Sequence, residues 1–383
     1  MSNVEIQGSD HLIGSIPLKQ SSAATGPREP STPTIVNLQA MRGIACLLVF
    51  IGHAFLLQPG IGFDKMGPYF GGIASSGVDI FFVISGFIIS TVAVRSARNG
   101  VGHRGIVAWN FGVKRLTRIY PVYWIVFALA VLLSPYIAYS PPQVPREPLI
   151  EQALLLTHFN SLIMAAWSLT FEVYFYVIVT AALLISPRRL PWLLALWAAV
   201  MSFIIIYGTF VRHEWITAVP TSPLILEFIF GMVIAFLIDR KLMGFAATAI
   251  VLGLVGFVVG LEAIRLRGWW TLGPWWRTLG NGLPMAFVLY GVIVLEMKGG
   301  WKFAKFWSKF GDASYSIYVW HQFIFYTVLK GLELAGVIPK VPGLILIAGW
   351  IVIALAVGFA SYRYIEMPIQ SRLNGLLLRR VAR

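Results

Sequence analysis

Two ionisable residues, Arg42 and His53, lie in a segment that is otherwise apolar enough to cross a membrane, VNLQAMRGIACLLVFIGHAFLLQ at 36–58. Their spacing places both side chains within about 20° on one face of a helix and separates them by about 16 Å along its axis. A charged group inside a membrane span is costly unless it faces a polar interior. The segment therefore predicts a helix face that takes part in chemistry, enclosed by the rest of the chain.

The composition is that of an integral membrane protein. Of the 383 residues, 58% are hydrophobic and only 12% are charged, which leaves too little polar surface for a soluble globular protein. The apolar segments are about twenty residues long and lack the alternation of a β-barrel. We expect an all-α, polytopic helical bundle with about ten transmembrane helices, roughly at 36–58, 71–94, 119–139, 168–186, 191–211, 223–239, 242–264, 281–297, 313–333 and 342–362.

Positive charge indicates how these helices are oriented. Most of the 30 lysine and arginine residues fall on one side of the expected spans, which predicts that both termini are cytoplasmic. Residues 1–34 are rich in Ser, Pro, Gly and Thr and have no signal-peptide pattern, so we expect a disordered tail there. A transmembrane domain over 35–370 and a basic tail over 371–383 follow. The net charge of +14 is then mainly a topology signal, and we expect no nucleic-acid partner.

A second group of charges precedes the third expected span. The segment ends in KRLTRIYP, where Arg115 and Arg118 are three residues apart and share a helical face. Guanidinium groups bind phosphate oxygens through paired hydrogen bonds and stay charged. The pair therefore suits a phosphorylated ligand. Anchoring at lipid headgroups is the other explanation of so basic a segment.

Two carboxylates are expected at the same depth as His53. Asp79 and Glu172 open the second and fourth spans from the outer side, and His53 lies near the outer end of the first. A carboxylate that is hydrogen-bonded to one imidazole nitrogen makes the other nitrogen a better base for taking a proton from an alcohol. We therefore predict a catalytic group of His53, Asp79 and Glu172. A purely structural role stays open for each carboxylate.

Several sequence motifs, taken in order, resemble those of the membrane-bound acyltransferase 3 family. They are Arg42 and His53 with ten residues between them, GVDIFFVISGFIIS at 77–90, KRLTRIYPVYW at 114–124, WSLTFEVYFY at 167–176, SYSIYVWHQFIF at 314–325 and YRYIEMPI at 362–369. The resemblance covers about residues 36–368. Members of this family O-acylate extracytoplasmic carbohydrates.

The resemblance implies an acyl-coenzyme A donor, with acetyl-coenzyme A favoured, that is bound from the cytoplasm of a bacterium at its inner membrane. It implies a carbohydrate acceptor on the other side, an exopolysaccharide by analogy with the single-domain members, and no metal. His53 matches the catalytic histidine, Arg42 its companion, and Arg115 and Arg118 the arginines associated with the donor. We expect His321, in the motif at 314–325, to be a further residue on the donor path, with an interhelical hydrogen bond as the alternative.

Two questions stay open at the level of the sequence. A transporter or flippase of a lipid-linked or anionic carbohydrate would also use intramembrane Arg and His residues. Within the acyltransferase hypothesis, His53 either deprotonates the acceptor for direct attack or carries the acyl group itself. Arg42, Ser85 or a backbone amide would stabilise the oxyanion. The oligomeric state is not indicated.

Overall fold

The computed structural model describes residues 35–56, 67–99, 103–137, 147–157, 161–212, 218–267, 275–336 and 342–378. The expected tail over 1–34 and the end of the basic tail, 379–383, lie outside these ranges. The described residues form helices and turns, and no strand occurs among them. The α-helices are α1 (Val36–Leu56), α2 (Gly67–Asn99), α3 (Arg104–Leu133), α4 (Leu149–Ala153), α5 (Trp167–Ile185), α6 (Leu190–Phe210), α7 (Ile225–Asp239), α8 (Ala246–Arg267), α10 (Leu283–Met297), α11 (Lys305–Leu334), α12 (Gly343–Ser361) and α13 (Met367–Leu377).

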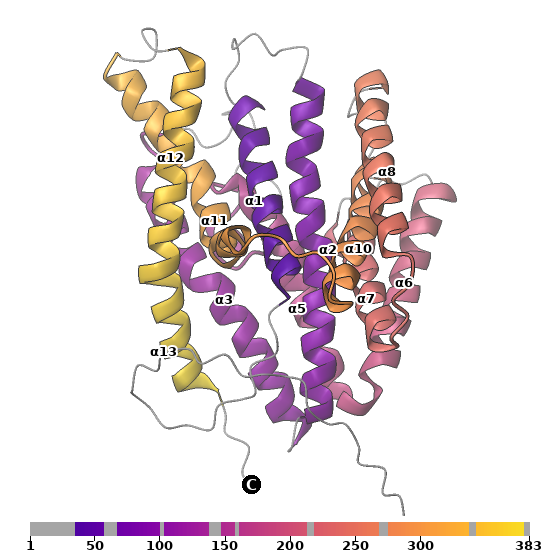
Figure 1. The fold of residues 1–383 in the computed structure, drawn as a ribbon. Coiled ribbons are helices and arrows are strands. Elements are labelled where there is room, and N and C mark those ends of the chain that lie inside the picture. The colour runs from indigo at the N-terminus through magenta and orange to yellow at the C-terminus, as the bar shows by residue number, and fades with distance from the viewer. Residues whose placement is uncertain are drawn as a thin grey trace, which may run out of the picture. The chain divides into compact units, whose positions relative to one another are not determined.

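The prediction of a polytopic helical membrane protein is confirmed. Each of the ten expected spans corresponds to a helix, and most of these helices run along a common direction (Figure 1). Eight helical segments of the described part are long and apolar enough to cross a membrane. The other two helices are α7, which has 15 residues and is about 22 Å long, and α11, whose 30 residues include many polar side chains.

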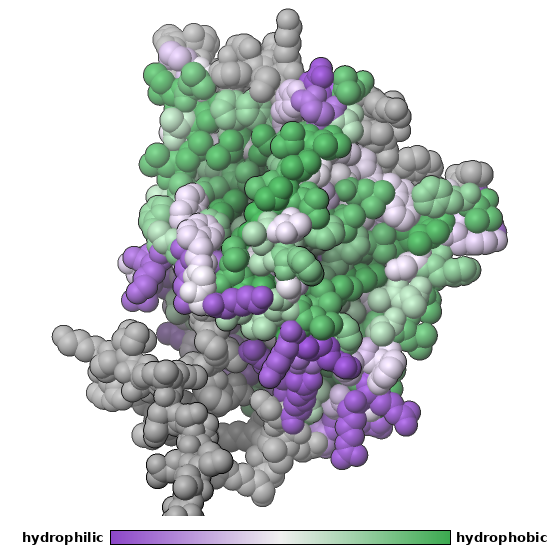
Figure 2. Space-filling model, turned by 45° about the vertical axis from the view of Figure 1, so that its right-hand side comes forward, coloured by the Kyte–Doolittle hydropathy of each residue, from purple (hydrophilic) through white to green (hydrophobic). Residues whose placement is uncertain are grey.

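Hydrophobic side chains cover much of the molecular surface. Figure 2 shows one face, on which hydrophobic residues (green) predominate and hydrophilic residues (purple) gather mainly towards one end. Large apolar side chains are exposed on α6 and α8, among them Trp192, Leu196, Phe203, Val255 and Val259. A surface of this kind would be a liability in water and suits contact with lipid chains.

The polar helix α11 lies against α1 at very short range. A Cβ atom on Gly311 of α11 would lie 1.9 Å from the Gln39 carbonyl oxygen, and one on Gly43 of α1 would lie 2.8 Å from the Phe310 Cβ. No residue other than glycine fits at Gly311 without moving a helix, because the obstructing atom belongs to the backbone. The two helices are therefore held close enough for their polar side chains to meet directly.

The start of α1 is fixed by a carboxylate at the end of α10. The backbone N–H groups of Val36 and Asn37 donate to the two oxygens of Glu296 at 2.9 and 2.7 Å. The Asn37 side chain donates to the Val292 carbonyl at 2.8 Å and accepts from the Phe303 N–H at 2.8 Å. A negative charge at a helix N-terminus satisfies free N–H groups and complements the helix dipole. These bonds set the axial position of α1.

A buried ion pair joins α2 to the segment that leads into α10. Asp79 is fully buried and accepts hydrogen bonds from the Arg277 guanidinium and, at 3.0 Å, from Asn281 Nδ2. The Arg277 guanidinium carbon lies 4.9 Å from the centre of the Trp167 ring at the start of α5. Buried partners of opposite charge depend on each other, because either one alone has lost its hydration without compensation.

We expect the Asp79→Asn substitution to destabilise the protein by about 3 kcal/mol, because the buried Arg277 loses its ion-pair partner and keeps only a longer-range interaction with the buried Glu227. The single cysteine, Cys46, is buried, so its reaction with a thiol-reactive dye on heating reports unfolding in detergent. The double variant Asp79→Asn/Arg277→Gln should recover part of the lost stability, since it removes both members of the pair. An Asp79→Asn protein with an unchanged unfolding temperature would contradict this structural role.

Candidate active site

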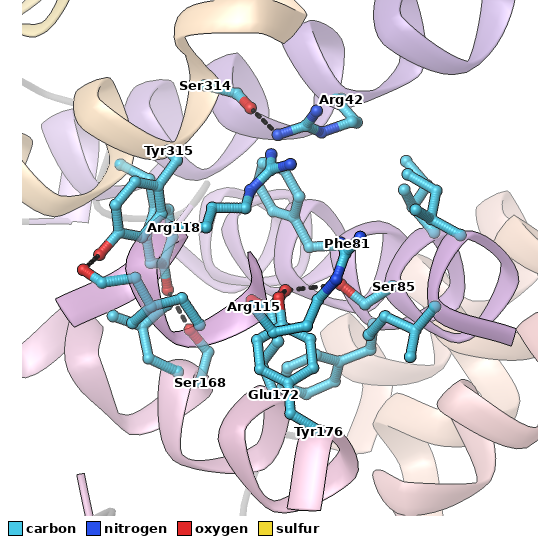
Figure 3. A pocket seen from close by; sticks show the side chains of 17 residues that line it. Arg42, Phe81, Ser85, Arg115, Arg118, Ser168, Glu172, Tyr176, Ser314 and Tyr315 are labelled. Carbon is cyan, nitrogen blue, oxygen red and sulfur yellow. Dashed lines mark hydrogen bonds between the residues drawn. The ribbon is translucent and has the colours of Figure 1, made fainter. Parts of the chain in front are cut away.

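A pocket opens between α1, α2, α3, α5 and α11, and three arginines supply the positive charge of its lining. Figure 3 shows these side chains around the cavity, with the Arg118 guanidinium turned towards Arg42. Aromatic and aliphatic side chains of α2 and α3 complete the wall. The polar lining residues are Arg42, Ser85, Arg115, Arg118, Ser168, Glu172, Tyr176, Ser314, Tyr315 and Tyr318.

The three arginines are not neutralised by ion pairs. Arg42 donates to Gln39 Oε1 and to Ser314 Oγ, both at 3.0 Å. Within the described ranges, no carboxylate oxygen lies within 4 Å of the guanidinium nitrogens of Arg42, Arg115 or Arg118. The buried Nε of Arg115 has no hydrogen-bond partner among the described residues. The pocket lining therefore carries three guanidinium groups and one carboxylate, an excess of positive charge that suits an anionic ligand.

Glu172 is the one carboxylate among the residues that line this pocket. Its Oε1 accepts from the Tyr176 hydroxyl at 2.5 Å and from the Ser85 hydroxyl at 3.3 Å. These bonds hold the carboxylate on the floor of the pocket, one helical turn from Tyr176 on α5. Glu172 thus lies with the arginines and not beside His53.

The imidazole of His53 meets a second imidazole. His53 Nδ1 lies 3.2 Å from His321 Nε2, and the two ring centres are 5.3 Å apart with the ring planes inclined by 24°. His321 Nδ1 is in turn hydrogen-bonded to the backbone carbonyl of Tyr318. No hydrogen bond joins His53 to a carboxylate in the described part of the chain. The prediction that Asp79 or Glu172 is hydrogen-bonded to His53 is therefore wrong for the described structure, in which the partner of His53 is His321.

Aromatic side chains enclose this pair on the side of His321. His321 is only 1% exposed, and the Phe50 ring stacks on the Trp350 ring with centres 4.5 Å apart beside it. Trp350 Nε1 also donates to the His321 carbonyl at 3.2 Å, which ties α12 to α11. His53 is less deeply buried than its partner. Of the two imidazoles, His53 is the one that a substrate reaches more easily.

Tyr318 connects the arginine pocket to the histidine pair. Its side chain lines the pocket and its hydroxyl lies 2.7 Å from Ser168 Oγ, while its carbonyl accepts from His321. Arg42 and Ser314 meet at the pocket, and His53 and His321 meet further along the same two helices. The expected common face of Arg42 and His53 is confirmed, because both side chains contact α11.

The structure thus divides the predicted site residues into three places. Arg42, Arg115, Arg118 and Glu172 share the pocket, His53 and His321 form the adjoining pair, and Asp79 belongs to the separate ion pair with Arg277. His321, which the sequence placed on the donor path, does not line the pocket. Three further lining residues were not predicted from the sequence, although they lie within the motifs at 167–176 and 314–325: Tyr176, Ser314 and Tyr318.

Comparison with known proteins identifies the family of the chain. Residues 35–363 match the family model described as "Acyltransferase domain", of the acyltransferase 3 type. The chain is 30% identical over 322 residues to the exopolysaccharide production protein ExoZ of Rhizobium meliloti (strain 1021), covering 81% of this chain and 93% of that protein. It is 22% identical over 332 residues to the putative membrane-bound transacylase BcsY of Komagataeibacter xylinus, covering 80% and 78% of the two chains. No solved structure matches significantly.

The family match begins one residue before α1 and ends two residues after α12, so it includes the arginine pocket and the histidine pair. The chain therefore belongs to the acyltransferase 3 family of membrane proteins.

Proposed function

We propose that the protein transfers an acyl group, with acetyl favoured, from acyl-coenzyme A to a hydroxyl of an extracytoplasmic carbohydrate, an exopolysaccharide or its lipid-linked repeat unit. The observation that carries this proposal is the succession of an arginine pocket and a histidine pair along α1 and α11. Family membership supports acyl transfer, and the name of one relative associates it with exopolysaccharide production.

The pocket has the chemistry that the donor requires. Coenzyme A carries phosphate groups at one end and the thioester at the end of an extended arm. Arg42, Arg115 and Arg118 supply three guanidinium groups against the single carboxylate of Glu172, so the pocket attracts phosphate. The rise of about 16 Å from Arg42 to His53 along α1 is of the order of the length of that arm. The thioester would then arrive beside the histidine pair.

His53 would act as the general base in direct transfer. It takes the proton of the acceptor hydroxyl while the hydroxyl oxygen attacks the thioester carbonyl carbon. The carbon–sulfur bond then breaks, and the departing sulfur receives the proton from His53 to give the free thiol of coenzyme A. His53 is hydrogen-bonded to His321 and to no carboxylate among the described residues, so no negative group beside it holds the imidazole in its charged form before the reaction.

The orientation follows from the distribution of positive charge. We propose that the end at which α1 begins faces the cytoplasm of a bacterial cell and that the protein lies in the inner membrane. Cytoplasmic acyl-coenzyme A would enter beside Arg115 and Arg118, and the carbohydrate would approach His53 from the opposite side. One active site would then join two compartments without either substrate crossing the membrane.

We expect His53→Ala to lower acyl transfer at least a hundredfold, because general acid–base catalysis contributes about 10²- to 10⁴-fold. The measurement is the transfer of radiolabel from acetyl-coenzyme A to the de-O-acetylated exopolysaccharide of the host, catalysed by purified protein in detergent. The unfolding temperature should stay close to that of the unsubstituted protein.

His103→Asn provides the matched control for that experiment. His103 is exposed and caps α3 by accepting from the Gly105 N–H at 3.2 Å, and asparagine is equally favoured as a cap. This variant should keep full activity. A His53→Ala protein that transfers label at the unsubstituted rate would remove the proposed role of His53.

We expect Arg115→Gln and Arg118→Gln each to weaken acetyl-coenzyme A binding about tenfold or more, because a hydrogen bond to a charged group contributes roughly 1.5–3 kcal/mol. Isothermal titration calorimetry gives the Kd directly. Arg104→Gln is the control on the same helix, since Arg104 is exposed and donates only to the Ile185 carbonyl at 3.1 Å. An unchanged Kd in both pocket variants would leave lipid contact as the role of these arginines.

A further inference from the structure

We propose that His321 is a positioning residue that fixes the tautomer of His53 through a chain of two hydrogen bonds, so that Nε2 of His53 is the nitrogen that acts as the base. The chain runs from the Tyr318 carbonyl through His321 to His53. This inference rests on the proposed function, in which His53 takes a proton from the acceptor.

The first hydrogen bond determines which nitrogen of His321 carries hydrogen. A backbone carbonyl only accepts, so His321 Nδ1 must donate to the Tyr318 oxygen. His321 is almost completely buried and hydrogen-bonds to no carboxylate among the described residues, and a charged imidazole there would lack compensation. His321 is therefore neutral, with hydrogen on Nδ1 and a lone pair on Nε2.

The second hydrogen bond transmits this choice to His53. Since His321 Nε2 has only a lone pair to offer, His53 Nδ1 must be the donor across the 3.2 Å contact. A neutral imidazole has one N–H group, so Nε2 of His53 is left with its lone pair free. That is the nitrogen needed to receive a proton from an alcohol. The Tyr318 carbonyl thus fixes the tautomer of His53 through His321, a role that a carboxylate has in other histidine-dependent enzymes.

The packing around His321 prevents the alternative ring orientation. The Phe50 and Tyr318 rings lie with centres 5.9 and 5.5 Å from the imidazole, and Trp350 holds the His321 carbonyl from α12. Turning the ring over would set a carbon atom against the Tyr318 carbonyl and lose both hydrogen bonds. The surrounding aromatic side chains therefore favour a single imidazole orientation.

The proton count balances with His321 unchanged at the end. The acceptor proton moves to His53 Nε2 as the oxygen–carbon bond forms, and the resulting imidazolium keeps donating from Nδ1 to His321. When the carbon–sulfur bond breaks, its electron pair leaves on sulfur, and the proton passes from His53 Nε2 to that sulfur. His321 stabilises the transient imidazolium by accepting from it and neither gains nor loses a proton.

Two substitutions of His321 by residues with a side-chain amide, glutamine and asparagine, distinguish this role from a structural one. The amide oxygen of glutamine can occupy the place of His321 Nε2 and accept from His53, whereas the shorter asparagine reaches only the place of Nδ1, beside the Tyr318 carbonyl. We expect His321→Gln to keep acyl transfer within about threefold of the unsubstituted protein. His321→Asn should lower kcat by about a hundredfold or more while KM for acetyl-coenzyme A stays unchanged.

The assay is the radiolabel transfer described above, with unfolding temperatures measured in parallel and His53→Ala run beside both variants. Equal activity of the His321→Gln and His321→Asn proteins, whether high or low, would overturn the proposal. If His53→Ala were itself fully active, the proposed base would be wrong, and this result is distinct from a failure of the relay alone.

A second measurement tests the relay without any substitution of His321. Solid-state NMR of ¹⁵N-histidine-labelled protein in lipid identifies which ring nitrogen carries hydrogen, and the His53 signals are assigned by their loss in His53→Gln. We expect hydrogen on Nδ1 of His53. Hydrogen on Nε2 would overturn the proposal whatever the stability of the variants.

Discussion

The close contact between α1 and α11 is the constraint on which the rest of the site depends. Gly311 allows the Gln39 carbonyl to approach to a distance at which no side chain would fit. At that separation, Arg42 reaches Ser314 and His53 reaches His321 without intervening atoms. The cap that Glu296 places on the start of α1 fixes the register of these contacts. A local property of two helices thus determines the geometry of both halves of the site.

The membrane makes the placement of polar groups strict. α11 is too polar to face lipid, and its buried run from Ser314 to Phe325 shows that the other helices enclose it. Asp79 has Arg277 as its partner, and Glu172 has two hydroxyl donors, so these carboxylates are compensated. The three pocket arginines, by contrast, have no carboxylate within ion-pair distance among the described residues. In a low-dielectric interior, an anionic donor would neutralise the excess positive charge of these arginines.

Local features of the sequence predicted the helical class, the ten helical segments and the common face of Arg42 and His53, because hydropathy and helical period depend on neighbouring residues only. The contact of His53 with His321, 268 residues away, depends on which helices pack together, and no local pattern encodes it. Asp79 and Glu172 illustrate the same limit. Both are carboxylates at a similar expected depth, yet Asp79 pairs with Arg277 and Glu172 lines the pocket.

The eleven-residue step from Arg42 to His53 makes α1 a ruler of about 16 Å between the arginine pocket and the histidine pair. Every acyl-coenzyme A has the same arm, so with the proposed donor this spacing would bring any thioester to the same point, whatever group it carries. Under the proposed function, selection between a two-carbon group and a longer one would be made beyond His53, by the side chains that the acyl group meets there. Donor capture and acyl-chain selection would then be separable properties, and the second could change in evolution without disturbing the first.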